Sequence, residues 1–516
     1  LLHGITGSGK TEIYIDLINK VMESGQQVLF LLPEIAITTQ MISRLYKAFG
    51  NSFGVYHSKY SDNERVEIWN GVLDESIRFV VGVRSSIFLP FQNLGLIIVD
   101  EEHETSYKQH QPSPRYHARD VALVLSRLHQ CSIILGTATP STESYFNAEK
   151  GKFDLIELNT RYGEAQLPEF KIIDIKTERQ KKKTKGEFAN LLLELLKSNL
   201  ENNYQSILFQ NRRGYSPILN CDDCGWTAKC VQCSVSLTYH QYKKELKCHY
   251  CGYSEPIPTT CPDCGSNKIK TVGFGTQKLE EDLSLLLPEA KIARMDLDTT
   301  RSKSSYDQII SNFENNEIDI LIGTQIVTKG LDFGKVNLVG IVDFDRMINY
   351  PDFRSFERAF QLSVQVSGRA GRRDIPGKVI IQTRKPGTEI INYIQKNDWK
   401  GFYNDELLER KNYHYPPFTR LVKISVKHKF AETASKAAFH LTELLRERLN
   451  STFLLGPEPG VISKIRNLYI YDILLKFYRN DADLQEKKNV IIDIENSIKA
   501  NRNYTGVRIN NDVDPG

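Results

Sequence analysis

The sequence lacks any apolar run of the roughly 18 or more residues that a membrane-spanning helix needs. A secretory leader is not expected either, because the first residues already belong to a motif. Strong charge imbalance is missing too: the formal net charge of the 516 residues is +4, so any nucleic-acid-binding surface must be local. With 40% hydrophobic and 25% charged residues, the composition is that of a globular protein of roughly three to four domains.

Cysteines for a disulfide framework are also missing. Eight of the nine cysteines form four Cys-x-x-Cys pairs, and the ninth, Cys131, lies in an apolar run that predicts a buried strand. Two thiolates separated by two residues can grip one tetrahedral metal, so the pairs supply ligands for two Cys₄ zinc sites. Thiols committed to metal predict a reducing, cytoplasmic environment. The pairs are Cys221/Cys224, Cys230/Cys233, Cys248/Cys251 and Cys261/Cys264.

Little of the sequence precedes its first motif. Only Leu1, Leu2 and His3 come before a glycine-rich loop that ordinarily follows a strand, and there is no initiator methionine. We therefore expect this chain to be a fragment whose natural N-terminal region is absent.

Residues 4–11 form a complete phosphate-binding loop, followed by a helical pattern over residues 12–23. Glycines let backbone amides point inward around phosphates, Lys10 reaches the β and γ groups, and Thr11 can ligate magnesium. The helix N-terminus adds a favourable dipole for the anion. The predicted ATP-binding residues are Gly4, Ile5, Thr6, Gly7, Ser8, Gly9, Lys10 and Thr11.

An acidic box follows a buried strand at residues 96–99. Asp100 emerges at the end of that strand, where it can hold magnesium through water, and Glu101 is placed to polarise the attacking water. His103 is a candidate relay between nucleotide and bound polymer, with a purely structural histidine as the alternative. Acidic pairs at strand ends are common by themselves, but the phosphate loop about 90 residues upstream indicates that this pair is the second half of a nucleotide site.

Two later segments complete a motor-like pattern. Residues 136–141 place small hydroxyl residues after another buried strand, where a sensor between lobes would sit. Residues 365–372 begin with Gln365 and carry Arg369 and Arg372, predicted to share one helix face. Arginine from a second lobe can stabilise a phosphoryl transition state, which would make hydrolysis depend on lobe closure.

Together these segments resemble the superfamily 2 helicases. The cysteine block between residues 211–215 and 323–330 makes the chain similar, in particular, to the PriA family of bacterial replication-restart helicases, also called primosomal protein N′. The similar stretches are residues 4–11, 32–35, 83–88, 100–103, 136–141, 211–215, 323–325 with 329–330, and 365–372.

The resemblance implies an α/β fold with two RecA-like parallel-sheet lobes, a cysteine-rich two-zinc insertion in the second lobe and a small α+β C-terminal domain. The expected boundaries are 1–160 for the first, ATP-binding lobe, 161–186 for a linker, 187–219 with 269–400 for the second lobe, 220–268 for the insertion and 401–516 for the C-terminal domain. The basic run at residues 181–185 is interpreted as part of the solvated linker, with phosphate contact as the alternative.

The resemblance also implies an ATP- and magnesium-dependent 3′-to-5′ DNA helicase. Such a motor acts on stalled or abandoned replication forks and initiates primosome assembly, with single-stranded and forked DNA, primosome proteins and single-stranded-DNA-binding proteins as partners. We expect a monomer. The family's zinc sites are nested, so one zinc would take Cys221, Cys224, Cys261 and Cys264, and the other Cys230, Cys233, Cys248 and Cys251. Spacing agrees independently for the inner site alone, whose two pairs are fourteen residues apart.

An aromatic and basic segment at residues 106–117 is similar to the family's aromatic-rich loop. Its rings can stack on unpaired bases while its cations meet phosphates, and a tethering loop with incidental tyrosines is the alternative. Gln325 and Lys329 lie in a later turn, placed to follow a single strand. Arg84, Arg212 and Arg213 are weaker candidates. The predicted DNA contacts are Tyr107, Lys108, Arg115, Tyr116, Gln325 and Lys329.

Two other functions fit parts of the pattern. An RNA helicase or another superfamily 2 motor would share the motifs, although no reader of the 2′-hydroxyl group is recognisable. A zinc-stabilised loading scaffold with a vestigial ATPase would explain the cysteines, although the complete nucleotide motifs argue against it.

Overall fold

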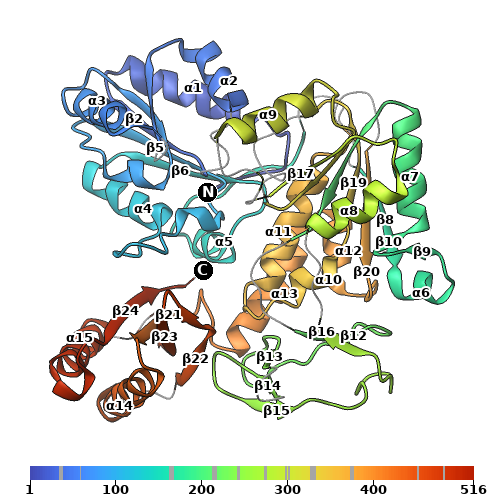
Figure 1. Ribbon diagram of the computed structural model, residues 1–516. Helices are drawn as coiled ribbons and strands as arrows, with labels where there is room; N and C mark the ends of the chain where they lie inside the picture. The colour runs from blue at the N-terminus through green and yellow to red at the C-terminus, as the bar shows by residue number, and fades with distance from the viewer. Residues whose placement is uncertain are drawn as a thin grey trace. The chain divides into compact units, whose positions relative to one another are not determined.

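The computed structural model of the chain divides into two compact units (Figure 1). Unit 1 comprises residues 1–212, 274–344 and 359–399, and unit 2 comprises residues 213–273, 345–358 and 400–516. The structure describes residues 1–33, 39–57, 60–161, 168–211, 218–240, 245–271, 276–296, 299, 303–325, 333–371, 377–449, 453–479, 481 and 483–515. Within these ranges, no helix has both the length and the apolar character needed to span a bilayer.

Unit 1 contains two parallel sheets. The first has the strand order β3-β4-β2-β5-β6-β1-β7, and every recorded pairing in it is parallel. Its strands are β1 (Leu2–Gly4), β2 (Gln27–Leu31), β3 (Phe53–Tyr56), β4 (Phe79–Gly82), β5 (Leu94–Asp100), β6 (Ser132–Thr137) and β7 (Ile156–Leu158). Its helices are α1 (Lys10–Glu23), α2 (Thr39–Phe49), α3 (Asp62–Leu73), α4 (Ala118–His129) and α5 (Thr142–Glu149), with short 3-10 turns η1 (Arg84–Phe88) and η2 (Thr105–Tyr107).

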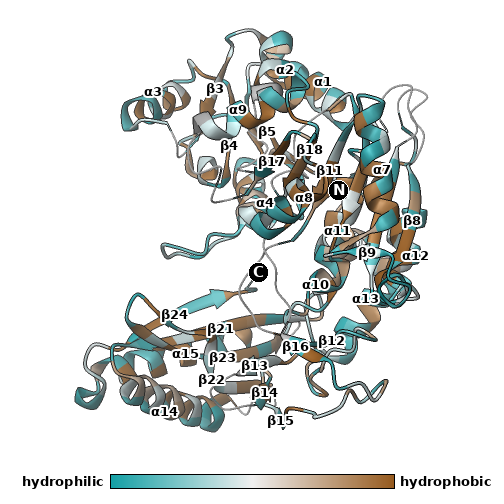
Figure 2. Cartoon of the chain, turned by 45° about the vertical axis from the view of Figure 1, so that its right-hand side comes forward, coloured by the Kyte–Doolittle hydropathy of each residue, from teal (hydrophilic) through white to brown (hydrophobic). Residues whose placement is uncertain are grey.

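Helices cover both faces of this first sheet. Alternate residues of β2 and β5 face opposite layers: Phe30 and Ile98 pack with side chains of α1 and α2, whereas Leu29 and Ile97 pack with side chains of α3 and α4. A strand buried on both faces must be apolar throughout, which is why the sequence shows continuous runs instead of alternation. In Figure 2, β5 is coloured predominantly hydrophobic, as are β11 (Gln205–Phe209) and β18 (Ile320–Gly323) of the second sheet described next.

The second sheet has the order β17-β18-β11-β19-β20-β8 and is also parallel. Its strands are β8 (Glu169–Asp174), β11 (Gln205–Phe209), β17 (Ile292–Met295), β18 (Ile320–Gly323), β19 (Val336–Ile341) and β20 (Lys378–Thr383). The associated helices are α6 (Ile175–Gln180), α7 (Asn190–Glu201), α8 (Thr276–Leu286), α9 (Lys303–Glu314), α11 (Ser355–Ser367) and α12 (Glu389–Lys396). Nearly all of α10 (Phe344–Ile348) and the first residues of α11 fall in unit 2. The fold class inferred from the motifs is confirmed.

One predicted boundary is wrong. Residues 161–186 were expected to be a linker, but β8 within them pairs with β20 along its whole length, from Glu169 against Lys378 to Asp174 against Thr383. The apolar residues Ile173 and Ile175 enter the core of the second lobe, and this burial outweighs the signals from Pro168 and the lysine run. A short hairpin of β9 (Thr184–Lys185) and β10 (Phe188–Ala189) follows α6.

Unit 2 combines the cysteine-rich region with the C-terminal domain. The cysteine-rich strands are β12 (Leu219–Cys221), β13 (Thr238–His240), β14 (Glu245–Lys247), β15 (Ser254–Pro256) and β16 (Ile269–Thr271), which form a two-stranded and a three-stranded antiparallel sheet. The C-terminal elements are α13 (Trp399–Asn412), β21 (Thr419–His428), α14 (Ala431–Leu449), β22 (Leu454–Ile465), β23 (Leu468–Tyr478), α15 (Leu484–Ala500) and β24 (Arg508–Val513). The antiparallel order is β22-β23-β21-β24, with α14 and α15 in its core.

A buried ion cluster stabilises unit 2. Arg410, 1% exposed, donates from Nε to Glu406 Oε1 and from Nη2 to Glu357 Oε2, both at 2.8 Å. Its Nη1 donates to the Pro416 carbonyl at 3.1 Å. Burial, with Glu357 nearby, raises the pKa of Glu406 to about 7 even though the arginine opposes the shift. Arg410 thus contacts both carboxyl groups, and Arg354 Nη1 lies 3.5 Å from the same Glu357 oxygen.

We predict that Arg410→Ala lowers the free energy of unfolding of unit 2 by about 3–5 kcal/mol, because the buried Glu406 loses its counter-charge and Glu357 keeps only the Arg354 contact. Urea titration of the chain, followed by tryptophan fluorescence and circular dichroism, measures the change. Lys411→Ala is the matched control: this neighbouring lysine is exposed, so its removal should change stability by less than about 0.5 kcal/mol. Equal effects of the two substitutions would contradict the importance assigned to the cluster.

Candidate nucleotide site and cysteine centres

The phosphate-binding loop joins β1 to α1. Although β1 has only three residues, it pairs with β6 on one side and β7 on the other, so the strand that the loop requires is present. Gly7 and Gly9 have φ of 83° and 87°, a region that favours glycine. Lys10 donates from Nζ to the Gly4 carbonyl at 2.6 Å, which folds its ammonium group back over the loop.

Asp100 ends β5 beside this loop. The Tyr14 hydroxyl, from α1, donates to Asp100 Oδ1 at 3.1 Å. Burial and the adjacent Glu101 carboxylate raise the pKa of Asp100 to about 7, while the Lys10 ammonium partly opposes the rise. Any side chain at Gly136, opposite Asp100 on β6, would overlap the Tyr14 hydroxyl. A bound cation would favour the ionised carboxylate at this position.

Glu101 and Glu102 have different surroundings. Glu101 has a left-handed backbone with φ of 49°, a strained conformation for a residue with a side chain, and its carboxylate is partly exposed. Glu102 is fully buried and accepts hydrogen bonds from the Ser141 amide at 2.6 Å, Ser144 Oγ at 2.7 Å and Arg119 Nη1 at 2.9 Å. Glu102 therefore fastens the acidic box to the segment that follows β6, a role that the sequence motif did not indicate.

His103 lies between the two lobes of unit 1. Gln365, on α11 of the second lobe, donates from Nε2 to His103 Nε2 at 2.7 Å and lies 3.5 Å from Glu101 Oε2. Because Nε2 accepts, the ring proton belongs on Nδ1, which is 2.7 Å from Thr137 Oγ1. The imidazole thus joins the acidic box, the segment after β6 and the second lobe.

A second glutamine supports the same arrangement. Gln361, one helical turn before Gln365, donates to the carbonyls of Thr139 and Pro140 at 3.4 and 3.3 Å. Sequence analysis missed Gln361. Its available signal was the i, i+4 spacing of two glutamines on one helix, which places both on the same face.

Of the two predicted transition-state arginines, Arg369 and Arg372, the structure describes Arg369. Arg369 follows the end of α11 at Ser367, so the expectation that it shares a helix face with Arg372 is wrong for Arg369; the small residues Ser367 and Gly368 end the helix. Its charge opposes the rise in the pKa of Tyr306 that burial causes. Arg372 lies outside the described residues.

Two of the predicted DNA contacts are contradicted. The Tyr107 ring is 1% exposed, and its hydroxyl donates to the carbonyls of Leu31 at 3.0 Å and Asp100 at 2.7 Å. Lys108 is 4% exposed, and its Nζ donates to the Arg115 carbonyl at 3.0 Å. Both side chains hold the loop in place, because the ring fills the core and the ammonium satisfies a backbone carbonyl.

The other predicted contacts have different surroundings. Arg115 and Tyr116 are partly exposed, and the Tyr116 ring meets the exposed Phe88 ring edge-on at 4.8 Å. Arg84 Nη1 donates to the carbonyls of Ser106 and Lys108, which anchors the loop to η1. Gln325 is partly exposed after β18, whereas Lys329, Arg212 and Arg213 lie outside the described residues.

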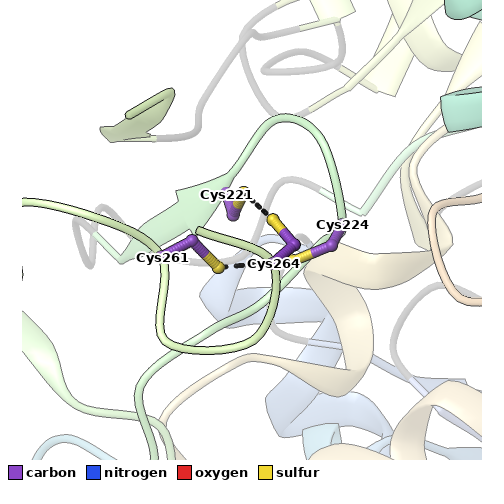
Figure 3. A group of neighbouring side chains, drawn as sticks. All are labelled: Cys221, Cys224, Cys261 and Cys264. Atoms are coloured by element: carbon purple, nitrogen blue, oxygen red, sulfur yellow. Dashed lines mark hydrogen bonds between the residues drawn. The ribbon is translucent and has the colours of Figure 1, made fainter. Parts of the chain in front are cut away.

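The eight paired cysteines converge in two groups of four. The outer group is Cys221, Cys224, Cys261 and Cys264, and the inner group is Cys230, Cys233, Cys248 and Cys251; in each, the sulfur atoms lie within 4.8 Å of one another. The nested grouping implied by the resemblance is confirmed. Figure 3 shows the outer side chains turned toward a common centre, with sulfur separations of 3.7 Å for Cys221–Cys264 and 3.4 Å for Cys224–Cys261.

Local backbone geometry explains this convergence. Each Cys-x-x-Cys pair closes a turn in which the amide after the second cysteine donates to the carbonyl of the first, and the donating residue has positive φ. The four residues are Gly225, Ser234, Gly252 and Gly265. Four thiolates at about 2.3 Å from a tetrahedral zinc would be about 3.8 Å apart, so the observed sulfur separations fit the ion.

Family models cover most of the chain. A model described as DEAD/DEAH box helicase matches residues 1–147, and a helicase conserved C-terminal domain matches residues 266–374. A model of the PriA DNA helicase Cys-rich region (CRR) domain matches residues 230–256, and a primosomal protein N C-terminal domain matches residues 411–516.

Curated relatives match over nearly the whole chain. The replication restart protein PriA of Bacillus subtilis (strain 168) is 42% identical over 510 residues, 96% of this chain and 63% of the relative. The PriA of Synechocystis sp. is 40% identical over 486 residues, 92% of this chain and 58% of the relative. The PriA of Chlamydia trachomatis serovar D is 38% identical over 522 residues, all of this chain and 68% of the relative. The chain thus spans about three fifths of the length of the first two relatives.

We predict that the chain binds two zinc ions and that Cys230→Ser reduces the content to about one, because a Cys₄ site loses a ligand. Elemental analysis of the purified chain by mass spectrometry measures the ratio. Cys131→Ser is the control: Cys131 lies outside both groups, so two ions should remain. Retention of two ions by a folded Cys230→Ser chain would contradict the assignment.

Proposed function

This chain belongs to the PriA family of replication restart proteins, and on that premise we propose that it is the motor portion of an ATP-driven 3′-to-5′ DNA helicase. Its proposed role is to remodel stalled or abandoned replication forks and to initiate primosome assembly. The proposed partners are single-stranded and forked DNA, primosome proteins and single-stranded-DNA-binding proteins.

The observation that supports a motor best is the contact of Gln365 with His103 and Glu101. It places a side chain of the second lobe against the residue proposed to polarise the attacking water. Hydrolysis that requires this contact also requires the lobes to be together, and loss of the γ-phosphate would then release them. A vestigial ATPase would have no need for such a contact.

The nucleotide chemistry is assigned to residues of the first lobe. Lys10 and the loop amides would hold the phosphates, and Glu101 would orient and polarise water. Thr11 and Asp100 would hold Mg²⁺, which neutralises charge on the phosphates. The Asp100 carboxyl must be ionised for that role, and the Lys10 ammonium favours the ionised form. Arg369 and Arg372 are proposed to stabilise charge in the transition state.

Force transmission is assigned to the segment 136–141. On one side, Thr137 contacts His103 and Ser141 contacts Glu102; on the other side, Thr139 accepts from Gln361. Arg84 and Lys108 fix the backbone of the aromatic loop, residues 106–117, close to the acidic box. DNA bound to that loop would therefore affect the nucleotide site. The zinc centres are proposed to be structural, since four sulfurs leave no position for water.

We predict that single-stranded DNA stimulates ATP hydrolysis by the chain and that Lys10→Ala abolishes the activity, because the phosphates lose their only loop cation. Steady-state ATPase assays with DNA, with RNA and with neither measure this. Lys20→Ala, an exposed lysine on the same helix, is the control and should retain activity. Stimulation by RNA alone would favour an RNA helicase, and absence of hydrolysis would favour a loading scaffold.

We predict that Gln365→Ala lowers DNA-stimulated kcat by about 10- to 100-fold with little change in ATP affinity, because it removes a group that contacts Glu101 and His103. Single-turnover hydrolysis and binding of a fluorescent nucleotide separate the two effects. Gln361→Ala, one turn away, leaves those contacts in place and should lower kcat less. A larger effect of Gln361→Ala would contradict the assignment.

A further inference from the structure

The strongest local charge that the structure describes lies in residues 176–185. These ten residues contain six lysines and arginines and one glutamate, a net charge of +5, whereas the whole chain of 516 residues has +4. The remaining residues therefore sum to −1. The segment lies outside all four ranges matched by family models.

A rigid scaffold carries these charges. Asp174 caps α6 by accepting from the amides of Lys176 and Thr177 at 3.1 and 3.3 Å. The chain then turns into the β9–β10 hairpin, and the Asn190 amide donates to the Lys183 carbonyl at 2.9 Å. Figure 1 shows α6, β9 and β10 together beside α7.

The hairpin is also locked to the second sheet. Gln382 on β20, 1% exposed, accepts from the Ala189 amide and donates to the Glu187 carbonyl, both at 2.9 Å. The ring of Phe188 and the side chain of Ile175 are buried in the core of the second lobe. The lysines therefore project from an ordered element, which reduces the entropy lost when they bind a ligand.

Most of the charge is uncompensated. Arg179 pairs with Glu187 at 2.7 Å. In contrast, Lys181, Lys182, Lys183 and Lys185 are exposed and form no ion pair with any carboxylate among the described residues. We call these four residues the lysine surface. Four like charges held close together repel one another, and a polyanion would relieve that repulsion.

The chemistry of the lysine surface favours phosphate groups over bases. Lysine ammonium groups are compact charges suited to phosphate, and proteins that bind single strands add aromatic rings on which bases stack. The aromatic residue that follows the lysines most closely in the sequence is Phe188, which is fully buried. A surface with cations but without exposed rings suits a sequence-independent contact with a duplex backbone.

We propose that the lysine surface binds the phosphate backbone of duplex DNA, which would let the second lobe hold the double-stranded part of a forked substrate. This proposal rests on the proposed function as a DNA motor and adds a second contact to it, separate from the aromatic loop of the first lobe.

The test compares the chain with a variant in which Lys181, Lys182, Lys183 and Lys185 are all changed to glutamine. Fluorescence anisotropy with a labelled 30-base-pair duplex is measured over a series of salt concentrations. Each lost phosphate contact should lower the slope of log affinity against log salt by about 0.9, so we expect a decrease of roughly 2–4 and about tenfold or more weaker binding near 0.1 M salt. Binding to a labelled oligo(dT) should change by less than about threefold.

The matched control changes four dispersed, exposed lysines, Lys150, Lys152, Lys197 and Lys278, to glutamine. It removes the same net charge and should retain most of the salt slope. Equal losses in both variants would reduce the effect to net charge and overturn the proposal. Weaker binding to oligo(dT) alone would overturn the proposal in favour of a single-stranded ligand. Unchanged duplex binding together with loss of binding to a poly-glutamate peptide would overturn it in favour of an acidic protein segment.

ATP hydrolysis without DNA provides a separate readout. None of the four lysines is assigned to nucleotide chemistry, so basal hydrolysis should be unchanged in the variant. Equilibrium binding to duplex does not require hydrolysis. A chain that binds duplex through these lysines but hydrolyses no ATP would therefore contradict the proposed motor while sustaining this contact.

Discussion

The hydrogen bond between Gln365 and His103 is the interaction on which the account of this protein depends. It joins two parallel sheets, each with its own hydrophobic core, at the end of the first sheet that carries the proposed catalytic residues. The imidazole can accept from Gln365 only if its proton is on Nδ1, so its bond with Thr137 and its bond with the second lobe fix one tautomer. A change at any of these three residues would therefore alter the hydrogen bonds of the other two.

Around that contact, the buried glutamate of the acidic box has a supporting role. Glu102 holds Ser141 and Ser144 through charge-assisted hydrogen bonds, which are stronger than neutral ones, and Arg119 balances its charge. The strained backbone of Glu101 sits between this fixed point and the Asp100 that ends β5. Backbone strain held in place by fixed neighbours is a common feature of functional sites, which agrees with the role proposed for Glu101.

In unit 2, the inner cysteine group is continuous with the C-terminal domain. The Tyr415 hydroxyl donates to the Cys233 carbonyl at 3.0 Å, and the Tyr415 ring stacks on Phe353 and lies under the Lys476 ammonium group. Zinc at the inner site would therefore hold in place a surface against which the C-terminal sheet packs. This explains why a cysteine-rich region with very short strands can be ordered.

Local patterns, namely the phosphate loop, the buried apolar strands and the Cys-x-x-Cys spacing, predicted the parallel-sheet lobes and the inner cysteine group. The outer cysteine group was implied by the family resemblance, because spacing alone agrees only for the inner site. Sequence reasoning failed for residues whose burial or secondary structure depends on packing against segments far away in the sequence. The Tyr107 ring is buried because β2 and β5 present carbonyls to its hydroxyl, and no local pattern records that arrangement. The segment 169–174 is a strand because β20 offers it an edge, although proline and lysines flank it. Gln361 and Glu102 matter through partners more than 30 residues away.

The most direct test of the central claim is a double-mutant cycle between His103→Ala and Gln365→Ala, measured as DNA-stimulated kcat. If the two side chains act through one contact between the lobes, the double mutant should be about as slow as the slower single mutant, so the two effects should not add. Full additivity of the two losses would mean that they act independently, and it would contradict the account in which lobe contact controls hydrolysis.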